Sequence, residues 1–231
     1  MKKVTRSNTL ARRLPLTRDR ILNTALDLAD KSGLESVSMR QVALGLGVEA
    51  MSLYKYVSNK DDLLDGLVEL VVVQISVPSL DIGWKQALKE RALSERKVLN
   101  LHPWAVTLFE STTGTGVTRL RHQNHMTGIL RRAGFSIELA LNTLIALTGY
   151  VYGFVILEQA WSFHPKAQPK VVKNPASVIS ETEHPYIFEL VKFAIAKKSE
   201  MAANGTSTSS GPFVDFEFGL NLILDGLERT L

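Results

Sequence analysis

The feature that most constrains the fold of this chain is an uncharged, largely apolar stretch of 19 residues at 139–157. A helix of that length can cross a membrane, and the stretch even contains a GxxxG pattern. No asymmetric basic flank accompanies it, and polar residues interrupt it at Asn142, Thr143, Thr148, Tyr150 and Tyr152. A helix that is apolar on all sides is also typical of a fully buried core. We therefore expect a buried helix surrounded by other helices, and no membrane insertion.

The rest of the chain carries helical rather than strand periodicity. Apolar residues recur at spacings of three and four after capping residues such as Thr17, Ser136 and either Ser58 or Asn59. The sequence has no internal repeat and no alternation of apolar and polar residues. It predicts an all-α fold, with two short helices inside 38–57 and further helices at about 17–31, 60–75, 84–100, 103–110, 117–132, 136–161, 185–201 and 213–229.

The two short helices within 38–57 are predicted to meet at a tight turn. Ser38 suits the N-cap of the first helix, and Gly47 suits a left-handed residue at its end. Leu53 and Val57 of the second helix, which starts near Glu49, would face the first. This is the arrangement of a helix-turn-helix, whose second helix enters the major groove of DNA. Two short helices could equally form a corner of any α-helical protein.

Positive charge is concentrated near the N-terminus. Residues 1–60 hold 11 Lys/Arg and 5 Asp/Glu, a net of +6, whereas residues 61–231 hold 16 and 18, a net of −2. The first 18 residues carry six basic side chains and no acidic one. A basic end on a near-neutral body is the charge pattern of phosphate binding, although a basic tail can also serve solubility alone.

Length and composition allow one or two domains with a sizeable core, since 45% of the 231 residues are hydrophobic. Pro78 and Gly83 mark the expected boundary. The expected parts are a basic arm at 1–15, a DNA-binding domain at 16–75 and a second domain at 76–231. The absence of cysteine excludes disulfides and thiolate metal sites. The basic start lacks the apolar core of a signal peptide, so a cytoplasmic protein is expected.

Several segments of the N-terminal quarter match one family in register. They are GLESVSMRQVA at 33–43, LGV at 46–48 and SLYKYVSNKDDLL at 52–64. They resemble the DNA-binding domain of the tetracycline-repressor (TetR) family. A weaker similarity to the ligand-binding domain of the tetracycline repressors themselves lies in AGFSIELAL at 133–141 and GFVILEQ at 153–159.

The resemblance implies a set of residues that contact a double-stranded DNA operator. The second short helix offers Ala50, Met51, Ser52, Tyr54, Lys55 and Tyr56. By the resemblance, the positions of Ala50, Met51, Ser52 and Tyr54 face bases or phosphates, and Arg40 would reach a base from the preceding helix. Arginine pairs bidentately with guanine, and alanine or methionine can touch a thymine methyl. Ser38, Lys60 and the arm are better phosphate candidates, and Tyr56 could instead be a packing residue. Met51 and Ala50 replace the Pro and Gln of tetracycline repressors, so a different operator is expected.

The resemblance also implies a homodimer, in which the helices at about 136–161 and 213–229 form a four-helix bundle, and a cavity for a small-molecule effector. Tetracycline repressors bind a magnesium-chelated drug through histidines. Phe109 and Ser76 stand at two of those histidine positions, which removes the ordinary nitrogen ligands of a divalent ion. We therefore expect neither magnesium nor tetracycline, and no cofactor.

The candidate cavity residues combine retained positions with aromatic side chains. Thr112 and Glu158 look retained, Met126 replaces a glutamine, and Arg91 and Glu95 replace an amide and an aromatic. His102 is either a polar group of the pocket or a turn residue. The aromatic candidates, each of which could be ordinary core, are Trp104, Phe109, Tyr150, Tyr152, Phe154 and Trp161. An aromatic and amphipathic ligand is the expectation.

Other chemistry finds little support in the sequence. His122 and His125 are three apart on a helix, but no carboxylate on the same face completes a metal site, so they are expected to be surface histidines. No nucleophile–base spacing, GxSxG or HExxH is present, and an enzyme is not expected. The expected function is a ligand-released repressor. A ligand-independent or activating regulator, and an α-helical enzyme or carrier, remain open.

Overall fold

The computed structural model describes residues 15–111, 116–161, 179–203 and 215–231, and its regular secondary structure in these ranges is entirely helical. The all-α prediction is confirmed. The α-helices are α1 (Arg18–Ser32), α2 (Met39–Leu46), α3 (Lys60–Val72), α4 (Trp84–Leu101), α5 (Ala105–Ser111), α6 (Val117–Arg132), α7 (Ile137–Trp161), α8 (Pro185–Ala203) and α9 (Phe216–Glu228). Two short 3-10 helices are η1 (Leu34–Ser36) and η2 (Ala50–Lys55).

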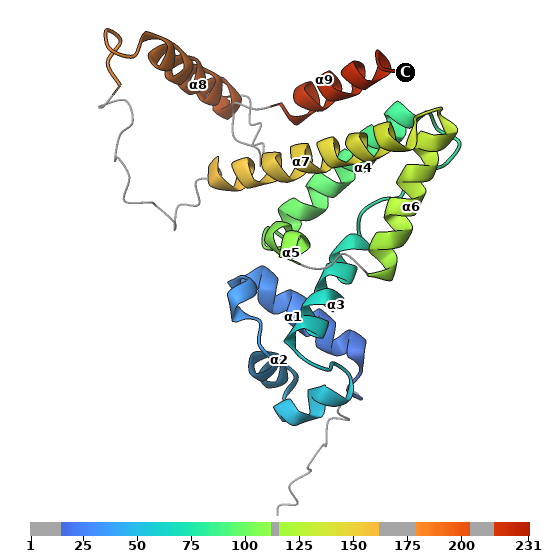
Figure 1. Ribbon diagram of the computed structural model, residues 1–231. Helices are drawn as coiled ribbons and strands as arrows, with labels where there is room; N and C mark the ends of the chain where they lie inside the picture. Colours follow the sequence, from blue (N-terminus) through green and yellow to red (C-terminus); the bar gives the residue numbers. More distant parts are fainter. Residues whose placement is uncertain (1–14, 112–115, 162–178, 204–214) are drawn as a thin grey trace, which may run out of the picture.

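The N-terminal helices form a small bundle, in which α1 packs against α2 and α3, and α2 packs against η2 (Figure 1). Its helices begin at the predicted caps: Thr17 accepts a hydrogen bond from the Arg20 amide at 3.3 Å, and Ser38 accepts one from the Gln41 amide at 3.2 Å. Gly47 ends α2 in the left-handed conformation, at φ 66°, where a Cβ would be strained. The fully buried residues of this bundle are Ile21, Ala25, Val37, Val42, Leu53, Val57, Leu63 and Leu67.

The second element of the helix-turn-helix is tighter than the α-helix expected from the sequence. In η2 the Ser52 amide donates to the Glu49 carbonyl at 2.9 Å, and the Tyr56 amide donates to the Leu53 carbonyl at 2.9 Å. The element has six residues and no side-chain N-cap, and such short pieces commonly adopt the 3-10 form. Leu53 and Val57 are fully buried, as predicted, and hold η2 against the bundle.

The helix α3 joins the N-terminal bundle to the rest of the molecule. It begins at Asn59, which accepts from the Asp62 amide at 2.8 Å, while Asp62 accepts from the Ser58 amide at 2.7 Å. The two bonds form a capping box in which the carboxylate reaches the Ser58 amide, one residue before the N-cap. At Gly66 the helix runs so close to α1 that an added Cβ would lie 2.4 Å from the Leu22 side chain. The helix also packs against α5 and α6.

The C-terminal half is organised around α7, which packs against α4, α6 and α9. Ser136 caps α7, as predicted, by accepting from the Leu139 amide at 3.0 Å. The crossing of α7 and α9 is close: a Cβ at Gly219 would lie 2.5 Å from the Tyr150 hydroxyl, which donates to the Phe216 carbonyl at 2.8 Å. By length and composition alone α7 could cross a membrane, a property that it shares with the central helices of soluble proteins.

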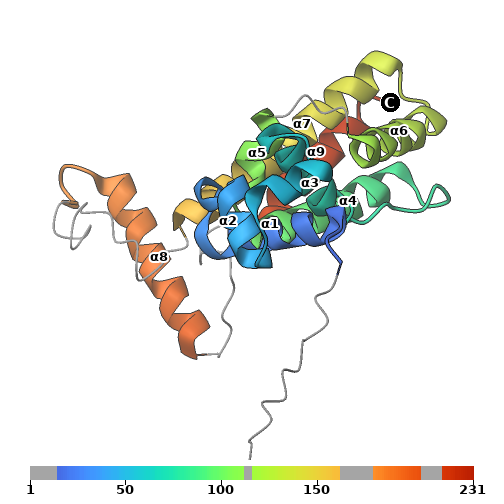
Figure 2. The same ribbon diagram turned by 90° about the horizontal axis from the view of Figure 1, so that it is seen from below.

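Apolar side chains are exposed on two parts of the C-terminal half. On α7 and α9 they are Ile137, Leu141, Ile145, Ile156, Leu157, Phe218 and Leu222. The helix α8 stands apart from the other helices (Figure 1 and Figure 2) and exposes Tyr186, Ile187, Leu190, Phe193 and Ile195. Contiguous exposed apolar surface of this kind marks interaction sites.

Candidate DNA interface and ligand cavity

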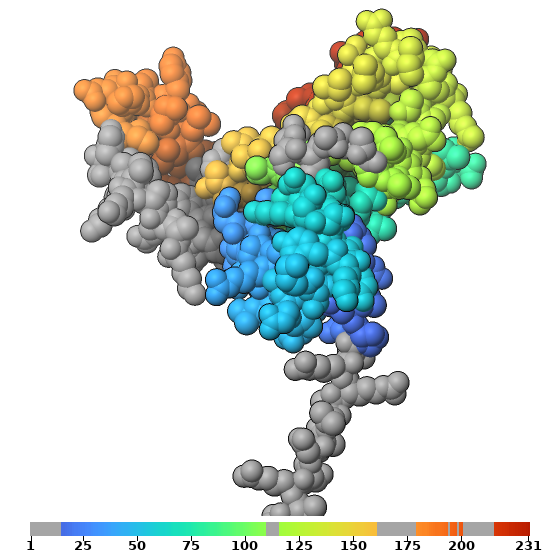
Figure 3. Space-filling model, turned by 60° about the horizontal axis from the view of Figure 1, so that its bottom comes forward, coloured from blue at the N-terminus to red at the C-terminus, as the bar shows by residue number. Residues whose placement is uncertain are grey.

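The residues predicted to contact DNA lie together at one end of the molecule, with α7 at the other end (Figure 1). Figure 3 shows the blue and cyan surface of this end facing the reader. Met51 is 76% exposed, and Tyr54 and Tyr56 are 47% and 40% exposed. Arg40, Lys55 and Lys60 are also exposed, while Ala50 and Ser52 are half-buried. A duplex could therefore reach η2 and the outer side of α2 at the same time.

Arg18, which the sequence did not single out, fixes the turn between η2 and α3 together with Asp62. Arg18 of α1 donates to the Tyr56 carbonyl at 2.9 Å and forms an ion pair with Asp62 at 2.6 Å. The hydrogen bond from Arg18 holds the pKa of Asp62 below its ordinary value. The pair spans 44 residues of sequence, so no local pattern could have revealed it. Ser38, a predicted phosphate contact, uses its hydroxyl oxygen as the cap of α2.

His102 and Trp104 lie at the junction between the two halves and do not line the cavity. His102 bonds to Asp30 of α1 through Nδ1 at 2.8 Å and to the Gln74 side chain through Nε2 at 3.2 Å. The Trp104 indole donates to the same Asp30 carboxylate at 2.7 Å. The α4–α5 connection is thereby tied both to the DNA-binding bundle and to the residues that follow α3.

A second connection between the halves runs from α3 to α6. The Glu69 carboxylate of α3 accepts hydrogen bonds from the backbone amides of Thr118, at 2.8 Å, and Arg119, at 3.4 Å. These amides belong to the first turn of α6, where no intrahelical acceptor exists for them. The fit is tight, because a Cβ at Gly116 would lie 2.0 Å from a Glu69 oxygen. A residue of the linking helix thus acts as the N-terminal cap of α6.

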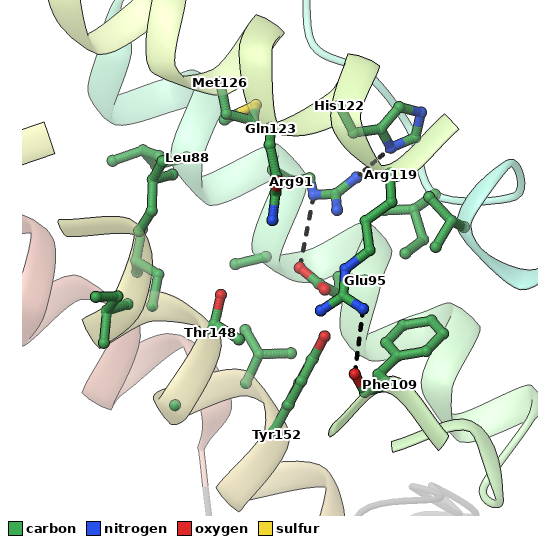
Figure 4. A pocket seen from close by; sticks show the side chains of 18 of the residues that line it. Leu88, Arg91, Glu95, Phe109, Arg119, His122, Gln123, Met126, Thr148 and Tyr152 are labelled. Carbon is green, nitrogen blue, oxygen red and sulfur yellow. Dashed lines mark hydrogen bonds and ion pairs between the residues drawn. The ribbon is translucent and has the colours of Figure 1, made fainter. Parts of the chain in front are cut away.

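The C-terminal half contains a cavity of about 730 Å³ between α4, α6 and α7, which is partly open to solvent (Figure 4). Of the predicted ligand contacts, Phe109 and Met126 line it, and Tyr152 lines it as well. Val72 at the end of α3 and Ile75, which follows that helix, also line the cavity. The volume lies within the usual range of small-molecule sites.

The other predicted ligand contacts lie elsewhere. Tyr150 and Phe154 stack with Phe216 of α9, at ring distances of 5.2 Å and 4.9 Å. Glu158 is buried in an ion pair with Arg96 and accepts a hydrogen bond from Asn100 at 3.0 Å. Thr112 falls outside the described residues, and nothing is described of the Trp161 side chain.

One end of the cavity is charged, because Arg91 and Glu95 of α4 meet Arg119 and His122 of α6 (Figure 4). Arg91 lies 3.5 Å from the Glu95 carboxylate and 3.0 Å from Nδ1 of His122. Burial raises the pKa of Glu95 against the opposing effect of both arginines. Burial, assisted by the Arg91 charge, lowers the pKa of His122.

The expectation of a surface histidine is wrong for His122, which is 7% exposed. It lies four residues before Met126 on the cavity face of α6, a spacing that could have revealed its position. His125 bonds to the Pro78 carbonyl at 2.7 Å. Within the described ranges no three His, Cys, Asp or Glu side chains are grouped as a metal would need.

Known protein families match both halves of the chain. Residues 21–67 match the family model for bacterial regulatory proteins of the tetR family, and residues 77–231 match that for the tetracyclin repressor-like C-terminal domain. The chain belongs to the TetR family of transcriptional regulators. The family is one of DNA-binding regulators, and the predicted resemblance is confirmed in both the N-terminal and the C-terminal part.

Relatives within the TetR family include repressors of similar length. The chain is 30% identical over 215 residues to the HTH-type transcriptional repressor DrrR1 of Streptomyces coeruleorubidus. The match covers 92% of this chain and 77% of that protein. It is 28% identical over 212 residues to an Escherichia coli class A tetracycline repressor, covering 90% and 89%.

Solved TetR-family structures share the fold. A possible TetR family regulator from Streptomyces coelicolor matches with a TM-score of 0.70 at 29% identity, covering 93% of this chain and 100% of that chain. ActR from Streptomyces coelicolor, solved in complex with actinorhodin, matches with a TM-score of 0.65 at 26% identity, covering 94% and 99%. That protein therefore binds a small molecule on the same architecture.

Proposed function

We propose that this TetR-family protein is a cytoplasmic, homodimeric repressor that binds a near-palindromic operator and releases it when a small molecule fills the cavity of the C-terminal half. The observation that carries the proposal is the place of α3. Leu63 and Leu67 belong to the core of the DNA-binding bundle, while Val72 of the same helix lines the cavity. One rigid element therefore touches both sites.

The exposed apolar residues of α7 and α9 support the dimer. Largely apolar helix faces of this kind are costly to leave in water, and covering them with the same faces of a second copy gives a closed twofold assembly. In such a dimer, two η2 elements would enter successive major grooves about 34 Å apart. A change in that spacing weakens operator binding without any change in η2 itself.

Release requires a ligand that favours a dimer geometry whose DNA-binding ends miss the operator spacing. The route from cavity to DNA is short. Glu69 holds the first turn of α6, and α6 supplies Arg119, His122 and Met126 to the cavity wall. Displacement of α6 by a ligand would move Glu69, and with it the helix that carries the DNA-binding bundle.

Selection of bound duplexes from a random pool tests the proposal directly. We expect enrichment of an inverted repeat whose half-sites are centred about one helical turn apart, and binding that weakens steeply with salt. Enrichment of no sequence would contradict operator binding. Enrichment of a single half-site would contradict the dimer.

Arg40→Ala is expected to remove base discrimination of about 1–3 kcal/mol at one position of each half-site. Arg40 is exposed on α2 beside η2, and a guanidinium can recognise guanine bidentately. Competition between the selected operator and its point variants measures the effect. Lys60→Ala is the matched control, since loss of a phosphate contact weakens all sequences equally. A uniform loss for Arg40→Ala would contradict base reading.

Glu69→Ala is expected to lower the free energy of unfolding by about 1–2 kcal/mol, the usual cost of removing a helix cap. Amide hydrogen exchange at Thr118 and Arg119 should accelerate, because these amides lose their acceptor. Asp65→Ala, which removes an exposed carboxylate one turn earlier on α3, should change stability by less than about 0.5 kcal/mol. Equal effects of the two substitutions would rule out the Glu69 cap as a special contact.

A further inference from the structure

The cavity has two chemically different ends (Figure 4). Figure 4 shows the Arg91, Glu95 and Arg119 side chains gathered at one end, with the Tyr152 ring beside them, and Leu88 and Met126 at the other. Apolar residues from α4, α6 and α7 form most of the wall: Leu88, Ala92, Met126, Leu141, Leu144, Ile145, Leu147 and Ile156. A ligand that fills this space must therefore be amphipathic, with a large apolar part and a small polar one.

Among the described residues that line the cavity, guanidinium groups outnumber carboxyl groups at the polar end. The lining residues include two guanidinium groups, Arg91 and Arg119, and one carboxyl group, Glu95. Glu69 lies nearby on α3 and keeps its negative charge, but its carboxylate accepts backbone amides of α6 and does not line the cavity. Arg91 faces Glu95, and Arg119 donates to the Phe109 carbonyl at 3.1 Å. The feature that bears on a ligand is therefore the presence of two guanidinium groups at one end of a largely apolar cavity.

Arg91 is held loosely by its protein partners. Its distance of 3.5 Å from the Glu95 carboxylate is longer than the roughly 2.7–2.9 Å of a charge-assisted hydrogen bond. One Nη1 hydrogen is directed to His122, and among the described residues no hydrogen bond satisfies Nη2. Since a guanidinium has five N–H donors, Arg91 keeps donors for a bound molecule.

His122 and Glu95, the groups beside Arg91, affect how its positive charge acts on a ligand. Burial, assisted by the Arg91 charge, lowers the pKa of His122 and so favours the neutral imidazole, whose Nδ1 can accept from Arg91 at 3.0 Å. The Glu95 carboxyl takes up a proton more readily than an exposed glutamate because it is buried. A bound amine would face two guanidinium groups, and Glu95, the one carboxyl group among the described lining residues, is already flanked by Arg91 and hydrogen-bonded by Tyr152.

We infer that the effector is an organic acid, whose carboxylate or sulfonate group binds Arg91 and Arg119 while its apolar body fills the space between α4, α6 and α7. This inference rests on the proposed function, because it names the chemical class of the ligand for the same cavity. It narrows the expected class of ligand from an aromatic and amphipathic molecule to one that is also anionic.

Two fluorescent dyes that share one aromatic body test the inference. Anilinonaphthalenesulfonate carries a sulfonate, and phenylnaphthylamine is the same body without it. An apolar cavity without excess charge would prefer the neutral dye, because the sulfonate loses hydration on entry. We expect fluorescence titration to show at least about tenfold tighter binding of the sulfonate, since hydrogen bonds to a charged group are the strong ones.

Three variants test whether the dyes bind in the cavity. The double substitution Arg91→Met with Glu95→Gln removes one guanidinium together with its carboxyl partner, so that neither of the two is left without the other, and Arg119 stays in place. It should weaken the sulfonate about tenfold and leave the neutral dye unchanged. Arg91→Lys keeps the charge and should retain most of the preference. Met126→Trp fills the apolar end and should weaken both dyes, and thermal melting verifies that each variant is folded.

The outcomes separate this inference from the proposed function. Equal affinity for the two dyes, with both weakened by Met126→Trp, would overturn the acid preference and leave the cavity as a ligand site. Binding that Met126→Trp does not affect would overturn both the acid preference and the cavity as the effector site. Operator selection does not depend on either dye and tests DNA binding separately.

Discussion

Replacing Arg96 with methionine is expected to lower the free energy of unfolding by about 3–5 kcal/mol, the usual cost of removing one partner from a buried ion pair. Arg96 of α4 donates through Nε to the Glu158 carboxylate of α7 at 2.9 Å and through Nη2 to its second oxygen. The Glu158 side chain is only 5% exposed. Its charge would therefore stay in the core without the guanidinium that faces both oxygens.

The same guanidinium also packs between aromatic rings, 4.8 Å from the centre of Phe216 and 5.4 Å from that of Phe154. Methionine replaces part of this packing but none of the charge. Urea denaturation at a fixed protein concentration measures the loss. The double variant Arg96→Met with Glu158→Gln should recover much of it, since no buried charge is then left unpaired. Lys97→Met, at an exposed neighbour on α4, is the control, and an equal loss there would contradict the explanation.

Leu222→Glu is expected to convert the protein to a monomer and to weaken operator binding by about 100-fold or more. Leu222 is 60% exposed on α9, within the apolar surface that α7 and α9 share. A carboxylate in the centre of a subunit interface would be desolvated without a partner. A monomer also loses the gain of about 10²–10⁴ that two linked DNA-binding ends provide.

Sedimentation velocity and operator titration measure the two effects of Leu222→Glu. Leu101→Glu is the matched control, because Leu101 is an apolar residue of similar exposure, 61%, that belongs to α4 and not to α7 or α9. It should leave both the dimer and the operator affinity unchanged. Loss of DNA binding by Leu222→Glu without loss of the dimer would show that this face does not form the interface.

Local signals in the sequence account for most of the fold. Thr17, Ser38, Asn59 and Ser136 all cap helices as predicted, because a capping hydroxyl or amide acts within three residues of its own position. The exception is η2, where no cap and a short length allowed the tighter 3-10 form. The family resemblance then supplied the global arrangement that local signals cannot give.

The cavity was less predictable, because its contents depend on how helices far apart in the sequence cross. Arg91 and His122 are separated by 31 residues and meet only where α4 passes α6. His102 and Asp30, which are 72 residues apart, meet at the junction of the two halves. The aromatic pattern that suggested ligand contacts at Tyr150 and Phe154 instead serves the packing of α9 on α7.

The helix α7 has a consequence for how such a regulator would respond in a cell. Leu141, Ile145 and Ile156 line the cavity and are also among its exposed apolar residues. In the proposed dimer, the side chains that meet the inducer lie on the helix that pairs the subunits, and binding linkage makes the two events influence each other equally. The dose of inducer needed to release the operator would then depend on the copy number of the protein. Strains that make few copies and strains that make many would switch at different inducer levels.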